Sequence, residues 1–260
     1  MRSPSKINRT LYFIVILTLV SASWLSSARP VEAAVTTSPI RYLPGFETYS
    51  LSANDDGSSY AEPIGFMVNF FGNQHDTLYV NNNGNVTFDS PQSTYTPYDL
   101  TSTTREIVAA FFGDVDTRGV DSSLVTYGND IVDGHLAFGI NYINVGYYSG
   151  NSDKLNSFQI ILVDRSDVGA GNFDIEFNYE KIQWEAGSAS GGVGGLGGSS
   201  ARVGFSNGTR VAGTFFELPG SAVNGAFLDT NFVTGLIYNT FNNTISGRYH
   251  FEARNGVINV

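Results

Sequence analysis

The sequence predicts an all-β protein, an antiparallel sandwich or meander with at most a short helix. It contains 19 Phe, 14 Tyr and 29 Gly among 260 residues, and only 15% of the residues are charged. Aromatic and β-branched side chains suit the pleated, half-buried surface of a sheet. Short apolar runs recur between Gly and Asn turns, which is typical of a sandwich with many short strands. Helical periodicity is absent after residue 33, apart from a possible turn or two of helix near residues 103–110.

The expected strands follow one another along most of the chain. They are residues 65–71, 77–81, 85–89, 106–112, 124–127, 135–145, 157–164, 172–185, 201–206, 214–218 and 248–254. Asn82-Asn83-Gly84 separates the second strand from the third. Because Asn and Gly both tolerate positive φ, this sequence between two β-rich runs predicts a hairpin.

The strand that starts at Asn172 alternates most clearly. Its apolar residues are expected to face one side and its polar residues the other: Phe173, Ile175, Phe177 and Tyr179 against Asp174, Glu176 and Asn178. Such alternation indicates a strand with two different faces.

Residues 1–33 are predicted to be a signal peptide, which leaves residues 34–260 as a single domain with its core at about 41–255. A basic start precedes the apolar run Leu11–Val20, and Val31-Glu32-Ala33 fits the small-x-Ala cleavage rule. The apolar run is too short to span a bilayer well, so we expect secretion and no stable membrane insertion after cleavage. The Gly-rich stretch 187–200 is predicted to be a flexible loop within the domain.

Charge and cysteine content exclude several kinds of function. Of 14 basic and 24 acidic residues, four and one lie in the first 33, so the remaining chain has 10 basic and 23 acidic residues and a net charge of −13. This charge argues against binding of nucleic acid or anionic lipid, which needs a basic surface. The absence of cysteine excludes thiol chemistry, cysteine-based zinc sites and disulfides, so stability must come from a hydrophobic core.

Several motifs in a fixed order resemble the nidogen-like extracellular (NIDO) domain. The first set is Phe70-Phe71-Gly72, Leu78–Phe88 (LYVNNNGNVTF), Tyr95-Thr96-Pro97 and Ile107–Arg118 (IVAAFFGDVDTR). The second set is Asn156–Gln159, Asn172–Tyr179, Ile182-Gln183-Trp184 and Ala201–Phe205. The resemblance covers roughly residues 41–255.

This resemblance implies a non-catalytic role in cell–matrix adhesion or extracellular structural interaction. The expected partners are extracellular matrix or cell-surface proteins, or glycans, and no catalytic residue or cofactor is carried over. In animals the domain stands beside cysteine-rich modules, which are absent here. The chain therefore resembles a bacterial stand-alone, secreted version of the domain.

Asp114 and Asp116 are the candidate metal ligands. Residues two apart on a strand face the same side, and calcium prefers such clusters of carboxylate oxygens. The spacing is not that of an EF-hand, and Arg118 could instead neutralise the pair. Further acids occur in the turns at Asp164-Arg165-Ser166-Asp167 and at Asp130 and Asp133, where Asp commonly stabilises turns. A calcium-dependent carbohydrate-binding module is therefore the alternative function.

Two stretches match catalytic or nucleotide-binding motifs by residue spacing, but they lack the structural context that these motifs require. Gly204–Gly208 matches G-x-S-x-G around Ser206, and Gly192–Gly197 matches G-x-G-x-x-G, but no helix is expected after either. His75, His135 and His250 are isolated, without metal-ligand spacing. A carboxylate pair could in principle hydrolyse a glycosidic bond, although nothing in the sequence fixes a separation. We therefore expect no enzyme activity.

Two further features concern the surface. Asn85, Asn207 and Asn242 begin N-glycosylation sequons, and Asn85 is expected to be accessible because it follows a hairpin turn. Tyr142, Tyr147 and Tyr148 could form a binding face, or they could simply pack on the sheet.

Overall fold

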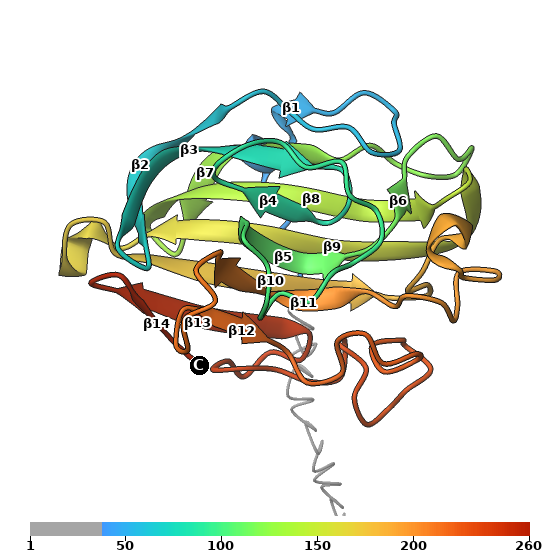
Figure 1. The fold of residues 1–260 in the computed structure, drawn as a ribbon. Helices are drawn as coiled ribbons and strands as arrows, with labels where there is room; N and C mark the ends of the chain where they lie inside the picture. The colour runs from blue at the N-terminus through green and yellow to red at the C-terminus, as the bar shows by residue number, and fades with distance from the viewer. Residues whose placement is uncertain (1–37) are drawn as a thin grey trace, which may run out of the picture. The chain divides into compact units, whose positions relative to one another are not determined.

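The computed structural model describes residues 38–260, which form two antiparallel sheets packed face to face (Figure 1). Helical structure in this part is limited to three short 3₁₀ turns, η1 (Pro44–Glu47), η2 (Ser166–Val168) and η3 (Ser188–Ser190). The all-β prediction is confirmed. The predicted signal peptide lies outside the described residues, and within 38–260 no helix is long and apolar enough to cross a membrane.

The larger sheet has eight strands. Their order is β1 (Tyr49–Ser50), β7 (Thr126–Val132), β8 (His135–Tyr147), β9 (Asn151–Asp164), β10 (Phe173–Lys181), β13 (Arg248–Arg254) and β14 (Val257–Asn259), with β6 (Val115–Asp116) pairing to β8. Strands β7 to β10 form a meander, in which each strand pairs with the next one along the chain.

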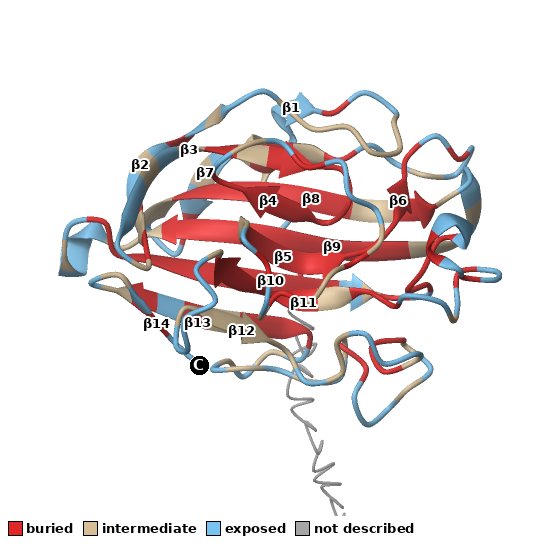
Figure 2. Cartoon of the chain, viewed as in Figure 1, coloured by how far each residue is buried: buried red, intermediate tan, exposed pale blue. Residues whose placement is uncertain are grey.

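The smaller sheet has six strands. Their order is β12 (Phe215–Glu217), β11 (Arg202–Asn207), β5 (Glu106–Phe112), β4 (Asn85–Thr87), β3 (Asn73–Asn81) and β2 (Glu62–Phe70). It lies in front of the larger sheet in Figure 1, and the strands facing each other are mostly buried (Figure 2).

The main hydrophobic core lies between the sheets and draws side chains from both. On β10 it contains Phe173, Ile175, Phe177 and Tyr179, as the alternation predicts. The Tyr179 hydroxyl reaches across the core and donates to the carbonyl of Ala110 in β5, at 2.7 Å. The two sheets are thus joined by apolar packing and by hydrogen bonds from tyrosine hydroxyls.

The outer face of the larger sheet carries a ladder of amide side chains. Gln159 Nε2 donates to Asn141 Oδ1 at 2.6 Å, and Asn178 Nδ2 donates to Gln159 Oε1 at 2.9 Å. Gln159 also bonds the backbone N–H and C=O of Arg41 at 3.1 and 3.0 Å. This ladder holds residues 38–48, here called the N-terminal segment, against β8, β9 and β10.

Phe46 packs on the same outer face, next to that ladder. It is fully buried with Val132, Ala137 and Ile161 in a small separate cluster. A Cβ at Gly139 would lie 2.5 Å from the Phe46 ring, so the glycine provides the space that the ring occupies. The N-terminal segment is therefore fixed by both polar and apolar contacts.

The predicted hairpin at Asn82-Asn83-Gly84 is confirmed, since Asn81 of β3 pairs with Asn85 of β4. Gly84 has φ of +75°, and a Cβ there would lie 1.9 Å from the carbonyl oxygen of Phe111. Any larger residue would adopt an unfavourable positive φ and would also clash with the Phe111 carbonyl. The turn is buried, because β5 and the large sheet cover it.

The helical turn expected near residues 103–110 is wrong, because β5 occupies residues 106–112. Val108 and Ala110 face the main core, while Ile107, Ala109 and Phe112 pack with Leu100 on the other side. The strand expected at residues 106–112 is thus confirmed, and both of its faces are buried. The sequence also did not predict the short strands β1, β6 and β14.

The Gly-rich stretch 187–200 is a folded loop between β10 and β11. The carbonyl of Gly195 accepts the N–H groups of Glu185 and Ala186 at 2.8 and 3.1 Å. The fully buried Glu185 carboxylate in turn accepts the N–H groups of Gly225 and Phe227 at 2.6 and 2.8 Å. Glu185 thereby anchors the irregular segment 219–247, in which no strand was expected.

Replacing Tyr142 by Phe should destabilise the fold by about 1 kcal/mol. The fully buried Tyr142 hydroxyl of β8 donates to the carbonyl of Asn81 in the other sheet at 2.7 Å. The matched control is Tyr60→Phe, because Tyr60 is 91% exposed and should contribute nothing. Urea unfolding measures both variants, and equal stability of the two would contradict the role of this bond.

Candidate functional site

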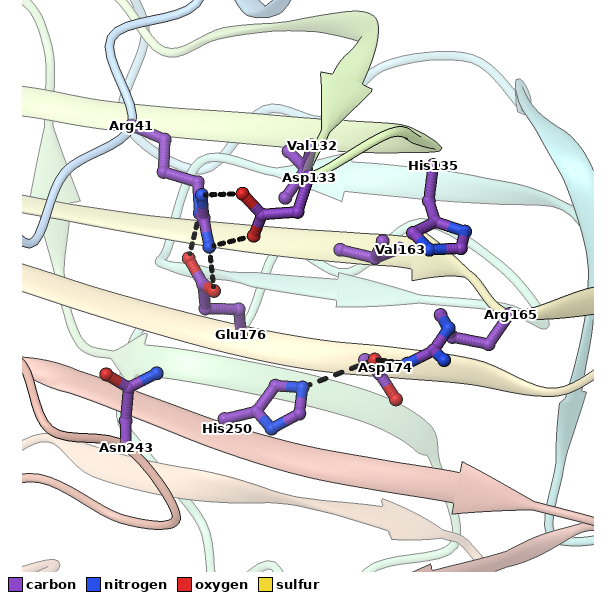
Figure 3. A pocket seen from close by; sticks show the side chains of 10 residues that line it. All are labelled: Arg41, Val132, Asp133, His135, Val163, Arg165, Asp174, Glu176, Asn243 and His250. Atoms are coloured by element: carbon purple, nitrogen blue, oxygen red, sulfur yellow. Dashed lines mark hydrogen bonds and ion pairs between the residues drawn. The ribbon is translucent and has the colours of Figure 1, made fainter. Parts of the chain in front are cut away.

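A charged hollow of about 300 Å³ lies on the outer face of the larger sheet (Figure 3). Ionisable side chains form most of its wall. The lining residues are Arg41, Val132, Asp133, His135, Val163, Arg165, Asp174, Glu176, Asn243 and His250. The polar residues of β10 that alternate with its core residues, Asp174 and Glu176, form part of its floor.

Arg41 joins two walls of the hollow, as Figure 3 shows. Its Nε and Nη2 donate to the two carboxylate oxygens of Glu176 at 2.7 and 3.0 Å, and Nη2 also donates to Asp133 at 2.9 Å. A bidentate arginine–carboxylate contact fixes the relative orientation of both groups. The backbone of Arg41 is itself bonded by Gln159 of β9, and Glu176 lies on β10, so both members of the pair are held by the larger sheet.

Asp174 lies at the other end of the hollow, among two guanidinium groups and one imidazole. Its carboxylate is 3.1 Å from Arg165 Nη1, 3.3 Å from His250 Nε2 and 2.6 Å from Arg254 Nη1. Burial opposes ionisation, but the bonds from His250 and Arg254 outweigh it and lower the pKa of Asp174 to about 2. The same contact with Asp174 raises the pKa of His250 above its ordinary value.

These pairings indicate what the hollow can do chemically. A general acid for glycoside hydrolysis needs a carboxyl group whose pKa is raised, whereas the pKa of Asp174 is lowered. The charged groups already hold one another in place. They offer a ligand hydrogen-bond donors and acceptors in fixed positions, on groups of positive and of negative charge. Such an arrangement suits recognition of a polar surface.

The structure places Asp114 and Asp116 in different surroundings. Asp116 accepts from Arg118 Nε and Nη2 at 2.8 and 2.6 Å and from the N–H of Gly150 at 2.7 Å. Burial alone would raise its pKa, but these bonds lower it below the ordinary value. The carboxylate of Asp116 is therefore already paired with the guanidinium of Arg118.

Asp114 instead lies with Asp55 and Asp56. One carboxylate oxygen from each of the three lies within 4.8 Å of the others. Burial, followed by the charges of neighbouring aspartates, raises the pKa of Asp114 to about 7 and that of Asp55 to about 6. Asp55 and Asp56 were missed from the sequence, where the pair of acids in Asn54-Asp55-Asp56-Gly57 was the available signal.

The other acidic residues also have partners. Asp130 lies on β7 and its Oδ2 accepts the N–H of the distant Gly45 at 2.8 Å, whereas Asp164 accepts both the N–H and the hydroxyl of Ser166. Asp167 is paired with Arg165 at 3.0 Å. The contacts of Asp164 and Asp167 fit the interpretation that these acids stabilise a turn, whereas that of Asp130 joins two distant segments.

The residues with possible catalytic spacing do not come together. Ser206 is 1% exposed on β11, and its hydroxyl accepts the N–H of Gly208 at 3.2 Å. Within residues 38–260 no hydrogen bond joins Ser206 to a histidine. Gly192–Gly197 lies in the folded loop, where Val193 pairs with Leu196 across a turn and no helix follows.

The three histidines occupy separate places in the fold. His75 lies on β3, stacked on Phe88 with its Nε2 3.0 Å from Glu106. His135 and His250 both line the charged hollow but pair with different carboxylates, those of Asp167 and Asp174.

Of the two alternatives for the tyrosines, packing on the sheet is the one observed, whereas one expectation for the sequons is wrong. Tyr142 and Tyr147 are 0% and 3% exposed, so they pack on the sheet and do not form a binding face. Asn85 is fully buried and Asn207 is buried, so the expected accessibility of Asn85 is wrong. The amide of Asn85 donates to the turn carbonyl of Asn83 at 3.0 Å, so its polar group is satisfied although it is buried. Asn242 is exposed.

Comparison with known proteins identifies the family. The family described as NIDO related matches residues 33–248. This chain belongs to the NIDO-related family. The resemblance to nidogen-like domains is thereby confirmed. No solved structure matches the chain.

Several animal proteins are similar to this NIDO-related chain. Alpha-tectorin of Mus musculus is 36% identical over 190 residues, which is 64% of this chain and 8% of alpha-tectorin. Alpha-tectorin of Gallus gallus is 35% identical over 190 residues, with 64% and 9% covered. Nidogen of Drosophila melanogaster is 28% identical over 185 residues, with 61% and 13% covered. The NIDO-related chain therefore matches only a small part of the length of each of these relatives.

The His250→Gln variant should be less stable than the native NIDO-related chain at pH 5.5, by about 1 kcal/mol, and the difference should shrink at pH 9. The pKa of His250 is raised, so its contribution is present below the unfolded value and is lost as the pH rises through the folded value. The pKa of Asp174 is lowered, so its contribution is lost only as the pH falls from about 4 towards 2. Urea unfolding at the two pH values measures the difference. The control is His135→Gln, because the contact of His135 with Asp167 is longer, at 3.8 Å, and more exposed; an equal pH dependence there would contradict the prediction.

Expression in a glycosylating host should modify Asn242 and leave Asn85 and Asn207 unmodified, because only Asn242 is exposed. Peptide mapping by mass spectrometry would detect the glycan, and Thr244→Ala should remove it. A glycan found at Asn85 would contradict the buried turn.

Proposed function

We propose that this chain is a secreted, non-catalytic binding domain that acts in adhesion or structural interaction outside the cell. One observation carries the proposal: the NIDO-related family matches residues 33–248, and the family resemblance implies cell–matrix adhesion and extracellular architecture. The relatives named alpha-tectorin and nidogen support an extracellular matrix setting. The expected partner is a matrix or cell-surface protein, or a glycan. The signal peptide and a bacterial origin stay predictions from the sequence.

The charged hollow is the surface that we assign to the partner. Its charges are fixed by ion pairs on four neighbouring elements: Arg41 before η1, Asp133 after β7, Glu176 on β10 and His250 on β13. Such pre-positioned groups lose little conformational entropy when a ligand binds. The hollow is open and mostly polar, so it suits a peptide segment or a glycan better than an apolar molecule.

A calcium-dependent carbohydrate-binding module is the second candidate. The cluster of Asp55, Asp56 and Asp114 favours it, because calcium prefers such clusters of carboxylate oxygens. This cluster is built from different residues than the hollow, so the two candidates can be separated by mutation.

The test uses the secreted protein, residues 34–260, against immobilised matrix proteins and glycans, in calcium and in EDTA. Saturable binding that survives EDTA supports adhesion through the hollow, whereas glycan binding that is lost in EDTA supports the second candidate. Absence of saturable binding in both buffers, or turnover of a bound glycan, would contradict the proposed function.

Arg165→Ala should weaken binding of the captured partner by about five- to thirtyfold, or about 1–2 kcal/mol. Arg165 lines the hollow, and Asp174 keeps His250 and Arg254 as partners when Arg165 is removed. Lys154→Ala is the matched control, since Lys154 is a cation paired with Asp153 away from the hollow. Surface plasmon resonance measures both affinities. An equal loss of affinity in the two variants would show that the partner binds outside the hollow.

A further inference from the structure

Three carboxylates that are far apart in the sequence meet at one end of the sandwich. Asp55 and Asp56 lie in the loop between β1 and β2, and Asp114 lies between β5 and β6. Their nearest ligand oxygens are all within 4.8 Å of one another. Two oxygens bound to one Ca²⁺ at 2.3–2.6 Å can be at most about 5 Å apart, so a single ion could reach all three.

Buried oxygens in this place have no partner. Asp114 is 1% exposed, and its Oδ2 accepts no hydrogen bond; Asp55 Oδ1 is also buried and unpartnered. Within residues 38–260 no basic side chain is paired with Asp114. Arg118 Nη2 contacts Asp55 Oδ2 at 3.0 Å, but its guanidinium is shared with Asp116. A buried carboxylate oxygen without a donor or a cation is strongly unfavourable.

A neutral side chain beside the cluster, Asn82, also has a buried oxygen without a hydrogen-bond partner. Asn82 is fully buried, and its Nδ2 donates to the carbonyls of Asp55 and Val115 at 2.6 and 2.7 Å, whereas its Oδ1 has no partner. This amide lies between the loop that carries Asp55 and the strand that follows Asp114. Its free oxygen is an observation independent of the acidic residues.

The surrounding contacts position the three carboxylates in advance. Asn83 Nδ2 donates to Asp56 Oδ1 at 2.8 Å, and the N–H of Tyr148 donates to the carbonyl of Asp114 at 3.1 Å. Gly187 leaves open the space beside Asp114 Oδ2, since a Cβ there would lie 2.1 Å from that oxygen. Asp55 and Asp56 are only half-buried, so water can supply further ligands.

We propose that Asp55, Asp56 and Asp114 bind one Ca²⁺ ion, which fastens the loop before β2 to the segment between β5 and β6. The ligand set contains only oxygen, without His or Cys, which favours a hard cation over zinc. Three carboxylates and additional water oxygens suit the flexible coordination of calcium better than the strict octahedron of magnesium. This role is structural and does not depend on which partner the hollow binds.

The test is calorimetric titration of the EDTA-treated, dialysed secreted protein with CaCl₂, in the absence of any partner. One saturable site and a higher Tm in calcium are expected. Asp114→Asn should weaken calcium binding at least tenfold and abolish the rise in Tm. Asp76→Asn is the matched control, because Asp76 is exposed on β3 outside the cluster and should behave as the native protein.

Asp56→Asn gives a second, independent readout if Asp114→Asn fails to fold. Asp56 is half-buried, and an Asn oxygen can still accept from Asn83, so circular dichroism should show a native fold while calcium binding weakens. No calcium binding by the native protein, preference for MgCl₂, or unchanged calcium affinity in the folded cluster variants would overturn the proposal. None of these outcomes bears on adhesion through the hollow, which is measured with partner present and in EDTA.

Discussion

Buried amide side chains in the turn between β3 and β4 hold three distant parts of the chain together. Asn81 Nδ2 bonds Asn85 Oδ1 at 2.9 Å within the turn, and Asn82 and Asn83 reach out to the loop at Asp55 and Asp56 and to Val115. A buried amide must satisfy its donors and acceptors, so only a narrow set of positions is allowed for the partners. The turn thereby fixes where the loop before β2 meets the larger sheet, and the position of the three aspartates follows from it.

The second organising feature is the difference between the two faces of the larger sheet. One face is apolar and packs on the smaller sheet, while the other carries the amide ladder, Phe46 and the charged hollow. The N-terminal segment covers part of this outer face and supplies Arg41 to the hollow. The hollow is thus a product of one sheet and the segment crossing it, and the acidic cluster is a product of the loops at the end of the sandwich.

Local patterns in the sequence predicted the features that depend on neighbours in the chain. Alternation along β10 identified both its core face and its polar face, and the Asn-Asn-Gly turn identified the hairpin of β3 and β4. The strand at residues 106–112 was predicted with its observed bounds, whereas the helical turn expected over the same residues was wrong. The partners in the hollow and in the cluster were out of reach, since Arg41 and Glu176 are 135 residues apart and nothing local pairs Asp114 with Asp55. The burial of Asn85 shows the same limit, because a turn that is usually exposed is covered here by another sheet.

The meander of β7 to β10 has a consequence for the order of folding. Its strands pair with their sequence neighbours, so they close short loops, whereas β13 joins β10 only after a long excursion and Arg41 meets its partners 92 to 135 residues away. Closing short loops loses less chain entropy, which favours early formation of local hairpins. We therefore expect the meander to assemble first and the segment around Phe46 to dock late, when Gly139 already offers its space. Pulse-labelling hydrogen exchange would show this sequence as early protection of amides in β8 and β9 and late protection of those near η1; simultaneous protection would argue for a single concerted step.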